Sequence, residues 1–491
     1  MHKLLEKLNV CGSWCNVSYT LEGKSPLARV GHSTHAVRMK CGNTGNRPLV
    51  IMIGGADASG VFNEAYILDI ISFMWYTVDL EQTIDFPGLG RCVELLQFMH
   101  ISYLLTNHFG YKELLIFGGA TKTGPLSQLL RLQIHCLSTP ENPSIYEEDR
   151  ITASLTQDRI HTDIQQFIYH PRTQHSSVSL TEYNQLIVFS GGNVGSQPVS
   201  DDKVYMYDSE INSWNIIPVE GLPPCSRLGH LILYEFPYEL ANSNYERIPK
   251  GKMYIHGGMV NEKLLDDIYV LHFTNQSDNN LHFKGIWNKL YPTDKLSPLT
   301  INHDNAESER EYLDPKCIEL TQIPSPSPRA AHGGTILTNK IYEQDTSKIL
   351  IFGGLSLNGA LNDMFCFDTS TRQWTEIKYG TSVLPSPRLD FAYCTFALIV
   401  KKDTKENSSM KIIFKSPKDN QYHDDIVNTD EHEGNNDKDQ YCQEYLFIHG
   451  GMDTHGSVFD DSYLILLSEY QLSNPLNAQT IVHRSSSHGK C

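Results

Sequence analysis

Histidines and paired aspartates are the residue types in this sequence that could do chemistry. The 491 residues include 21 histidines, and imidazole nitrogens are common ligands of zinc, copper and iron. Asp-Asp pairs occur at 201–202, 266–267 and 460–461, and two nearby carboxylates can share general acid–base work. Either kind of site requires the side chains to converge on one ion or one substrate.

Repetition along the chain argues against both kinds of site. The histidines recur in an Arg-x-x-His motif, at Arg29 with His32, Arg172 with His175, Arg227 with His230 and Arg329 with His332. Residues that recur once per repeat have a structural role in each repeat, so we predict that these side chains bond neighbouring strands or buried carbonyls. The aspartate pairs recur in the same way, and we predict that they begin strands and bond local backbone amides.

Other catalytic signatures are missing from the sequence. It contains no CxxC pair for zinc, no GxSxG elbow, no P-loop and no dinucleotide fingerprint. A Ser-His-Asp arrangement assembled by the fold stays open at this point. Cys366 and Cys394 lie in strand-like runs and are expected to be buried thiols. We predict a protein that is not an enzyme and that has no catalytic residue, no metal and no cofactor.

Six apolar runs that end in a glycine pair mark the elements that position the motifs. Glycine at the end of a buried strand indicates that a side chain there would collide with neighbouring backbone. The pairs are Gly54 and Gly55, Gly118 and Gly119, Gly191 and Gly192, Gly257 and Gly258, Gly353 and Gly354, and Gly450 and Gly451. His256 and His449 stand where other runs have Phe, so we predict that both are buried and hydrogen-bonded.

Each repeat is predicted to contain four strands. The Arg-x-x-His strand precedes the Gly-Gly strand, an alternating strand led by acidic or amide residues follows, and a tryptophan opens the fourth. These tryptophans are Trp75, Trp214, Trp287 and Trp374. Four antiparallel strands form one blade of a β-propeller. The order resembles the kelch repeat, which implies an all-β, six-bladed kelch β-propeller.

The remaining tryptophan indicates how the ring closes. The sixth repeat has no tryptophan strand, and Trp14 precedes the first repeat. We predict that strand 14–21 completes the last blade, because a closed ring leaves no open sheet edge. The propeller is expected over 14–467, with blades at 27–80, 91–168, 171–219, 225–291, 327–379 and 386–467.

Two repeats depart from the pattern, and three segments exceed ordinary loop lengths. Arg91 is followed by Glu94 and Arg388 by Phe391, and the second repeat also lacks its tryptophan. The long segments are 137–168, 291–326 and 401–443. The last has early lysines and late carboxylates, a composition typical of disorder, and 471–491 is predicted to be a flexible tail.

Charge and hydropathy limit the partners. The net charge of −17 disfavours nucleic acid and anionic lipid. No signal peptide and no apolar run of about 18 residues is present. We therefore expect a cytoplasmic monomer that binds no nucleic acid and does not insert into a membrane.

The chain resembles the Rab effectors with kelch motifs, which bind the late-endosomal Rab GTPase number nine. The matching stretches are 23–33, 195–208, 254–271, 384–390 and 449–465. The resemblance implies a non-catalytic scaffold that binds a GTP-loaded Rab GTPase in endosome-to-trans-Golgi transport, peripheral on endosomal membranes through that partner. We expect the partner on the rim formed by 56–63, 193–200, 259–265, 355–361 and 452–459 with 220–226 and 380–387.

Two other classes of kelch propeller remain as alternatives. One is a metalloenzyme, either an oxidase or a specifier-like protein. The Glu-x-x-x-Asp-x-x-x-His pattern of the specifier proteins is broken here, because Tyr441 follows Glu433 and Asp437. The other is a scaffold that binds actin or chromatin factors.

Overall fold

The computed structural model describes residues 14–18, 22–40, 46–82, 101–106, 112–121, 124–127, 129–137, 150–157, 171–180, 183–193, 197–235, 251–275, 283–292, 325–338, 347–379, 383–401, 413–415 and 440–471. Every regular element named in these residues is a β-strand, which confirms the all-β class. In this part of the chain no helix has the length and apolar character needed to cross a membrane.

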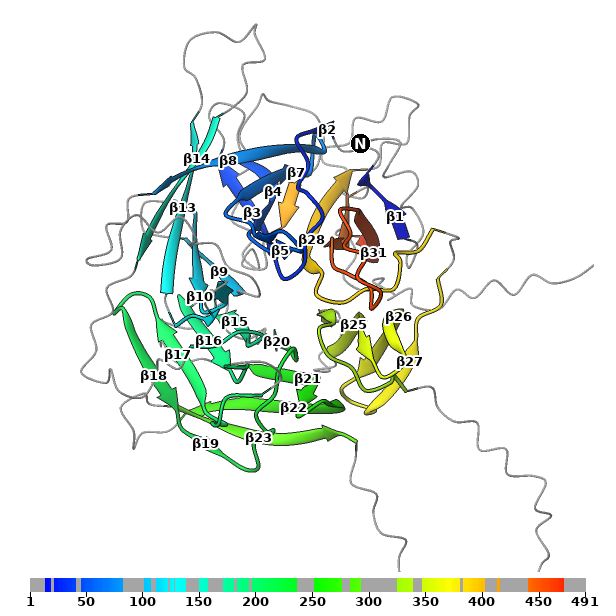
Figure 1. Ribbon diagram of the computed structural model, residues 1–491. Coiled ribbons are helices and arrows are strands. Elements are labelled where there is room, and N and C mark those ends of the chain that lie inside the picture. The colour runs from blue at the N-terminus through cyan, green and yellow to red at the C-terminus, as the bar shows by residue number, and fades with distance from the viewer. Residues whose placement is uncertain are drawn as a thin grey trace, which may run out of the picture.

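Most strands belong to five large sheets that stand around a common axis, as the blades of a propeller do (Figure 1). Two of these sheets have four antiparallel strands in chain order. One contains β15 (Ser176–Leu180), β16 (Gln185–Phe189), β17 (Val204–Asp208) and β18 (Ser213–Ile217). The other contains β24 (Gly333–Thr338), β25 (Ser347–Ser356), β26 (Gly359–Asp368) and β27 (Gln373–Glu376).

A third sheet adds a short strand to the same antiparallel plan. Its main strands are β20 (Leu231–Glu235), β21 (Lys252–Val260), β22 (Lys263–Asn275) and β23 (Phe283–Tyr291). Strand β19 (Val219–Glu220) pairs in parallel with β23. The connection from the preceding sheet thus covers the edge that β23 would otherwise expose.

The first and last described strands meet in a fourth sheet, with the order β1-β31-β30-β28-β29. It contains β1 (Trp14–Asn16), β28 (Ala392–Lys401), β29 (Ile413–Lys415), β30 (Gln440–His449) and β31 (Ser462–Gln471). Trp14 lies opposite Ile465 in the antiparallel register, and the Val17 N–H donates to the Ser462 carbonyl at 2.9 Å. The predicted pairing of the Trp14 strand with the last Asp-Asp strand is therefore present.

The largest sheet corrects the expected number of separate sheets. Nine strands share it, and its main path is β3-β4-β7-β8-β14-β13-β10-β9. They are β2 (Glu22–Gly23), β3 (Ser33–Lys40), β4 (Asn46–Ile53), β7 (Ala65–Asp69), β8 (Met74–Gln82), β9 (Ile101–Thr106), β10 (Lys112–Phe117), β13 (Leu129–Leu137) and β14 (Arg150–Gln157). The outer strands β8 and β14 pair in parallel over 79–82 and 152–155. This junction joins the first two repeats, so there are five large sheets where six were predicted.

Hydrophobic clusters fill the spaces between successive repeats. Alternate residues of β4 show this arrangement, because Val50 and Met52 pack toward β30 while Leu49 and Ile51 pack toward β10 and β13. Both faces of the strand are buried, which explains its continuous apolar run. Trp14 belongs to the cluster between the fourth sheet and β25, and its ring centroid lies 4.9 Å from that of Phe352.

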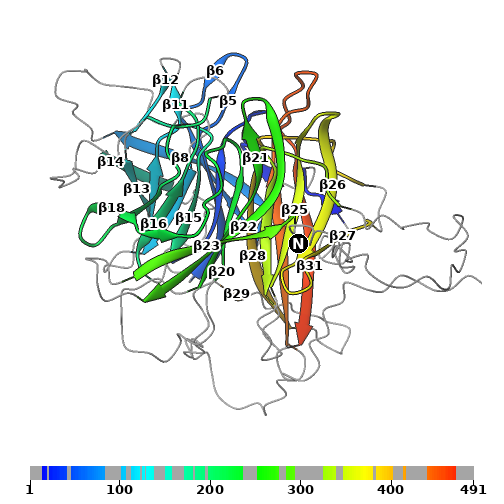
Figure 2. The same cartoon turned by 90° about the horizontal axis from the view of Figure 1, so that it is seen from below.

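Two small hairpins complete the described strands. They are β5 (Ala56–Asp57) with β6 (Gly60–Val61), and β11 (Ala120–Thr121) with β12 (Gly124–Pro125). Each follows a Gly-Gly pair and lies on the upper side of the molecule in Figure 2, as do the turn after β21 and the loop before β31. The loops that follow the glycine pairs therefore share one side, which we call the loop face.

The long segments are only partly described. Residues 413–415 and 440–443 are strand residues paired with β28, although their composition predicts disorder. Residues 150–157 within the long segment 137–168 form β14. Residues 402–412 and 416–439, most of 291–326, residues 19–21 of the closing segment and the tail from 472 onward lie outside the described residues.

Candidate functional site

Five buried arginines join successive repeats. They are Arg29, Arg172, Arg227, Arg329 and Arg388, each at most 1% exposed. In every case Nη1 donates to the carbonyl of the first Gly-Gly position in the same repeat, at 2.9–3.0 Å. The carbonyl of each arginine accepts the N–H of the second position in the preceding repeat. Each arginine thus connects two repeats.

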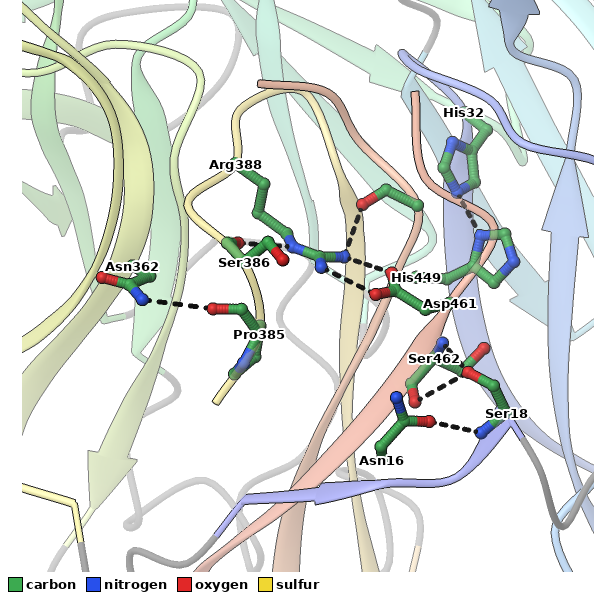
Figure 3. A network of polar contacts seen from close by, with 11 residues as sticks. Asn16, Ser18, His32, Asn362, Pro385, Ser386, Arg388, His449, Asp461 and Ser462 are labelled. Atoms are coloured by element: carbon green, nitrogen blue, oxygen red, sulfur yellow. Dashed lines mark hydrogen bonds and ion pairs between the residues drawn. The ribbon is translucent and has the colours of Figure 1, made fainter. Parts of the chain in front are cut away.

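A carboxylate accompanies each of these guanidinium groups. Arg329 reaches both oxygens of Asp363 at 2.6 and 2.9 Å, and Arg388 does the same with Asp461 at 2.7 and 3.0 Å (Figure 3). The other pairs are Arg227–Asp267, Arg29–Glu64 and the longer Arg172–Asp201 contact at 3.9 Å. The prediction that the Asp-Asp pairs begin strands and bond local backbone amides is corrected for Asp267 and Asp461, which bind a buried arginine.

The motif histidines face the preceding repeat. His32 Nε2 lies 3.0 Å from His449 Nδ1 (Figure 3), and His332 Nε2 lies 2.8 Å from His256 Nδ1. The predictions that His256 and His449 are buried and hydrogen-bonded are confirmed. The other interfaces pair rings in the same place, at His175–Phe117, His230–Phe189 and Phe391–Phe352.

Burial keeps these imidazoles neutral. It lowers the pKa of His256 and of His449 to about 3, with a further contribution from nearby arginines, and it lowers the pKa of His230 and His332 well below the ordinary value of 6.5. A neutral imidazole has one donor and one acceptor nitrogen, so each His–His pair can form one hydrogen bond.

This burial predicts acid sensitivity. Below pH 6.5 these histidines bind protons in the unfolded chain but not in the folded one. The free energy of unfolding should therefore fall as the pH is lowered, by up to about 1.4 kcal/mol per pH unit for each histidine. The double change His256→Phe with His332→Phe copies the Phe352–Phe391 interface and should reduce that slope, measured by urea unfolding between pH 7 and 5. The exposed His455→Ala is the control, and an unchanged slope in the double variant would contradict the prediction. Burial raises the pKa of Asp390 to about 7, which acts in the opposite direction in every variant and cancels in the comparison.

The glycine pairs do not lie where the sequence predicts, at the end of a strand. Three pairs follow strands that have already ended, at Ile53, Phe117 and His449: Gly54 and Gly55 after β4, Gly118 and Gly119 after β10, and Gly450 and Gly451 after β30. Two pairs lie inside a strand, at a register shift: Gly257 and Gly258 in β21, and Gly353 and Gly354 in β25. The backbone leaves the regular ladder at the pair in all five repeats.

Backbone conformation adds a second reason for glycine at these positions, beyond the collision that the sequence predicts. The first glycine of each of these five pairs has φ of 61–63°. The second has φ of 86–101°, at Gly55, Gly119, Gly258, Gly354 and Gly451. A residue with a Cβ is strained at such angles.

Crowding at the pairs comes from two different neighbours. A Cβ added at Gly257 would lie 2.6 Å from the Arg329 carbonyl oxygen of the next repeat. A Cβ at the second glycine would lie 2.7–2.9 Å from the Cβ of the motif histidine of its own repeat, or of the phenylalanine that replaces it, at Gly55, Gly258, Gly354 and Gly451. The first glycine therefore faces the neighbouring repeat, and the second lies against the first strand of its own.

Crowding and backbone conformation can be separated experimentally. Gly258 has φ of 99° and Gly456 has φ of 92°, but nothing lies within 4 Å of a Cβ added at Gly456. Gly456→Ala should cost about 1 kcal/mol of stability, from backbone conformation alone. Gly258→Ala should cost clearly more, because backbone must also move. Equal melting temperatures for the two variants would contradict the steric explanation.

The third repeat is one residue out of register with the predicted pair. Thr173 forms a β-bridge with Gly192, as Leu228 does with Met259, so Gly192 occupies the place that follows the pair in other repeats. Ser190 and Gly191, with φ of 53° and 104°, hold the two crowded positions. The predicted pair of Gly191 and Gly192 is corrected to Ser190 and Gly191.

A second link between repeats consists of main chain alone. Two residues after the motif arginine, a residue with positive φ donates its N–H to the equivalent carbonyl of the preceding repeat, at 2.7–3.1 Å in the four described cases. This axial ring contains Gly31, Gln174, Gly229, Ala331 and Asp390. Val93, the corresponding residue of the second repeat, lies outside the described residues.

Residues 346–380, which contain β25 to β27, match the family model of the Kelch motif. The chain thus contains a kelch motif. It is similar to the Rab9 effector protein with kelch motifs of Mus musculus, with 26% identity over 448 residues that cover 90% of each chain. The Homo sapiens protein of the same name is 28% identical over 252 residues, 51% of this chain and 54% of that protein. Tip elongation aberrant protein 3 of Schizosaccharomyces pombe is 26% identical over 181 residues, 37% of this chain and 13% of that protein.

The kelch tryptophans are all buried in the spaces between repeats. Trp14, Trp75, Trp214, Trp287 and Trp374 are each at most 3% exposed. Trp75 and Trp374 pack on His449 and His256, with ring centroids 5.9 and 5.4 Å apart. Within the described residues no group of three or more His, Cys, Asp or Glu side chains could hold a metal ion.

A buried proline that the sequence analysis missed completes the kelch connections. It stands three residues before the motif arginine in four repeats, at Pro26, Pro224, Pro326 and Pro385. The arginine Nε donates to the carbonyl of the next residue, which is Leu27, Cys225, Ser327 or Ser386. The side chains of these four residues are exposed. The recurring Pro-x-x-Arg spacing would have revealed this device, which fixes the connection and turns one side chain toward solvent.

Proposed function

We propose that this kelch-repeat protein is a non-catalytic scaffold that binds a GTP-loaded Rab GTPase and acts in endosome-to-trans-Golgi transport. The observation that carries the proposal is the similarity over 90% of the chain to a protein named for Rab9 and kelch motifs. The protein would then be cytoplasmic and reach endosomal membranes through its partner.

The recurring residues support a scaffold and not an active site. The five buried arginines, their carboxylates and the histidine pairs all bond neighbouring repeats, which uses their charge and hydrogen-bonding capacity inside the fold. Connections held by buried Pro and Arg offer a rigid surface, and a surface that is fixed before binding loses little conformational entropy on association.

We also propose that the nine-stranded sheet represents two blades, which would give six. One cluster packs Ile51 and Ile53 of the first repeat against Leu114 and Ile116 of the second. The other clusters pack successive repeats face to face in the same way. The parallel contact between β8 and β14 would then be an added link at the outer edge.

A pull-down with a panel of Rab GTPases tests the function. The full chain should retain Rab9 loaded with a non-hydrolysable GTP analogue and release the GDP-loaded form. If the chain retains the two forms equally, or if it retains no Rab GTPase of the panel, the effector function is contradicted.

A further inference from the structure

Exposed apolar side chains are concentrated on one part of the loop face. Seven large apolar residues are exposed in the described part of the chain: Leu27, Ile71, Ile211, Leu222, Leu357, Val383 and Leu384. We call Leu27, Leu357, Val383 and Leu384 the apolar rim patch. Their side chains are 61%, 85%, 47% and 37% exposed. Clustered exposed apolar groups mark interaction sites more often than scattered ones do.

Contacts between the loops place the patch over three successive repeats. The turn that carries Leu357 reaches the last repeat, where a Cβ at Gly359 would lie 3.2 Å from Thr454 Oγ1. The segment of Val383 and Leu384 is joined to β26 by the Asn362 side-chain amide, which donates to the Pro385 carbonyl at 3.2 Å (Figure 3). On the other side, the N–H of Arg29 donates to the carbonyl of Phe459, which brings the Leu27 connection beside the loop before β31.

The backbone beneath the patch is held by buried groups. Arg388 donates to the Ser386 carbonyl at 3.0 Å, and Arg29 donates to the Leu27 carbonyl at 2.9 Å. The Arg388 guanidinium also lies 4.6 Å from the ring centroid of Phe459. The apolar side chains therefore project from fixed connections, as the anchors of a preformed binding surface do.

Acidic residues accompany the apolar ones. The Asp453 carboxylate accepts N–H groups from Ser457 and His455 at 2.8 Å each, which lowers its pKa and keeps it charged. Asp460, at the end of the same loop before β31, is exposed. The whole chain has a net charge of −17, so a partner approaching this surface experiences a negative field.

We propose that the apolar rim patch is the docking surface for the Rab GTPase, and that it receives a partner surface with an apolar centre and lysine or arginine at its margin. This assignment rests on the proposed function. The apolar centre provides affinity, and the flanking carboxylates accelerate association and exclude acidic surfaces.

The test compares patch and control substitutions in the full chain. The double variant Leu357→Glu with Leu384→Glu should weaken binding of GTP-loaded Rab9 at least tenfold in calorimetry. Leu222→Glu is the matched control, because Leu222 is 85% exposed and stands five residues before Arg227, as Val383 stands before Arg388. It should bind like the unaltered chain. Asp460→Lys should weaken binding a few-fold and reduce its dependence on salt.

The outcomes separate the patch from the function. If the unaltered chain binds Rab9 and the double variant binds equally well, or if Leu222→Glu is equally damaging, the patch assignment is wrong and the Rab function stands. If the unaltered chain binds no Rab GTPase, the proposed function fails and the patch assignment with it. Leu357→Ala with Leu384→Ala repeats the comparison should the glutamate variant melt at a lower temperature.

Discussion

Replacing Arg388 by alanine is expected to lower the free energy of unfolding by about 3–5 kcal/mol, since it removes the fully buried partner of an ion pair with Asp461. The change leaves the Gly450 and Ser386 carbonyls without the guanidinium donors and leaves Asp461 without its cation. Arg388→Lys should recover only part of the loss, because an ammonium group cannot reproduce the two-pronged contact with the carboxylate and also reach both carbonyls. Urea unfolding followed by tryptophan fluorescence measures the change.

The control for this variant is an exposed cation of the neighbouring sheet. Lys378→Ala removes one positive charge from an exposed position and should change stability by less than about 0.5 kcal/mol. An Arg388→Ala protein as stable as the Lys378→Ala protein would show that the buried arginine is dispensable.

Removing residues 1–24 is expected to cost even more, because it deletes the strand that joins the two ends of the chain. The deletion removes the pairing of β1 with β31 and the Trp14 ring from its cluster, and loss of a buried tryptophan side chain alone costs about 3–5 kcal/mol. It also exposes the edge of β31, which favours aggregation. A lower melting temperature and a larger hydrodynamic radius should result.

A truncation at the other end is the comparison. The predicted tail is 471–491, but Gln471 is the last residue of β31. Removal of 472–491 should leave the melting temperature nearly unchanged. The single change Trp14→Ala distinguishes loss of the ring from loss of the strand. If both truncations melt alike, closure by β1 contributes little to stability.

Much of the fold could be predicted because it follows from the spacing of residue types that recur along the chain. The glycine pairs locate the buried strands, and the single tryptophan before the first repeat predicts the pairing of Trp14 with the last sheet. The parallel contact between β8 and β14 could not be predicted in this way. It joins residues 79–82 to 152–155, and such pairing depends on where two distant edges meet and not on hydrophobic periodicity.

The register of the third repeat and the bonding partners of the aspartates were harder to predict. Ser190 replaces a glycine, and only the β-bridge of Gly192 reveals the shift. The bonding of Asp267 and Asp461 to buried arginines depends on side chains that converge from segments 40 and 73 residues apart in the sequence. A sequence shows that an acidic residue recurs in most repeats, but the partner of each carboxylate emerges only when the repeats are assembled.

The axial ring of main-chain hydrogen bonds has a consequence for how this architecture can vary. Glycine, alanine, glutamine and aspartate all occupy its positions with φ between 51° and 63°, so the bonds that hold one repeat to the next do not depend on the side chain. These positions can therefore carry other residues that tolerate this conformation while the repeats stay joined. Divergence, or deliberate redesign, can change the side chains at these positions without breaking the main-chain bonds between repeats.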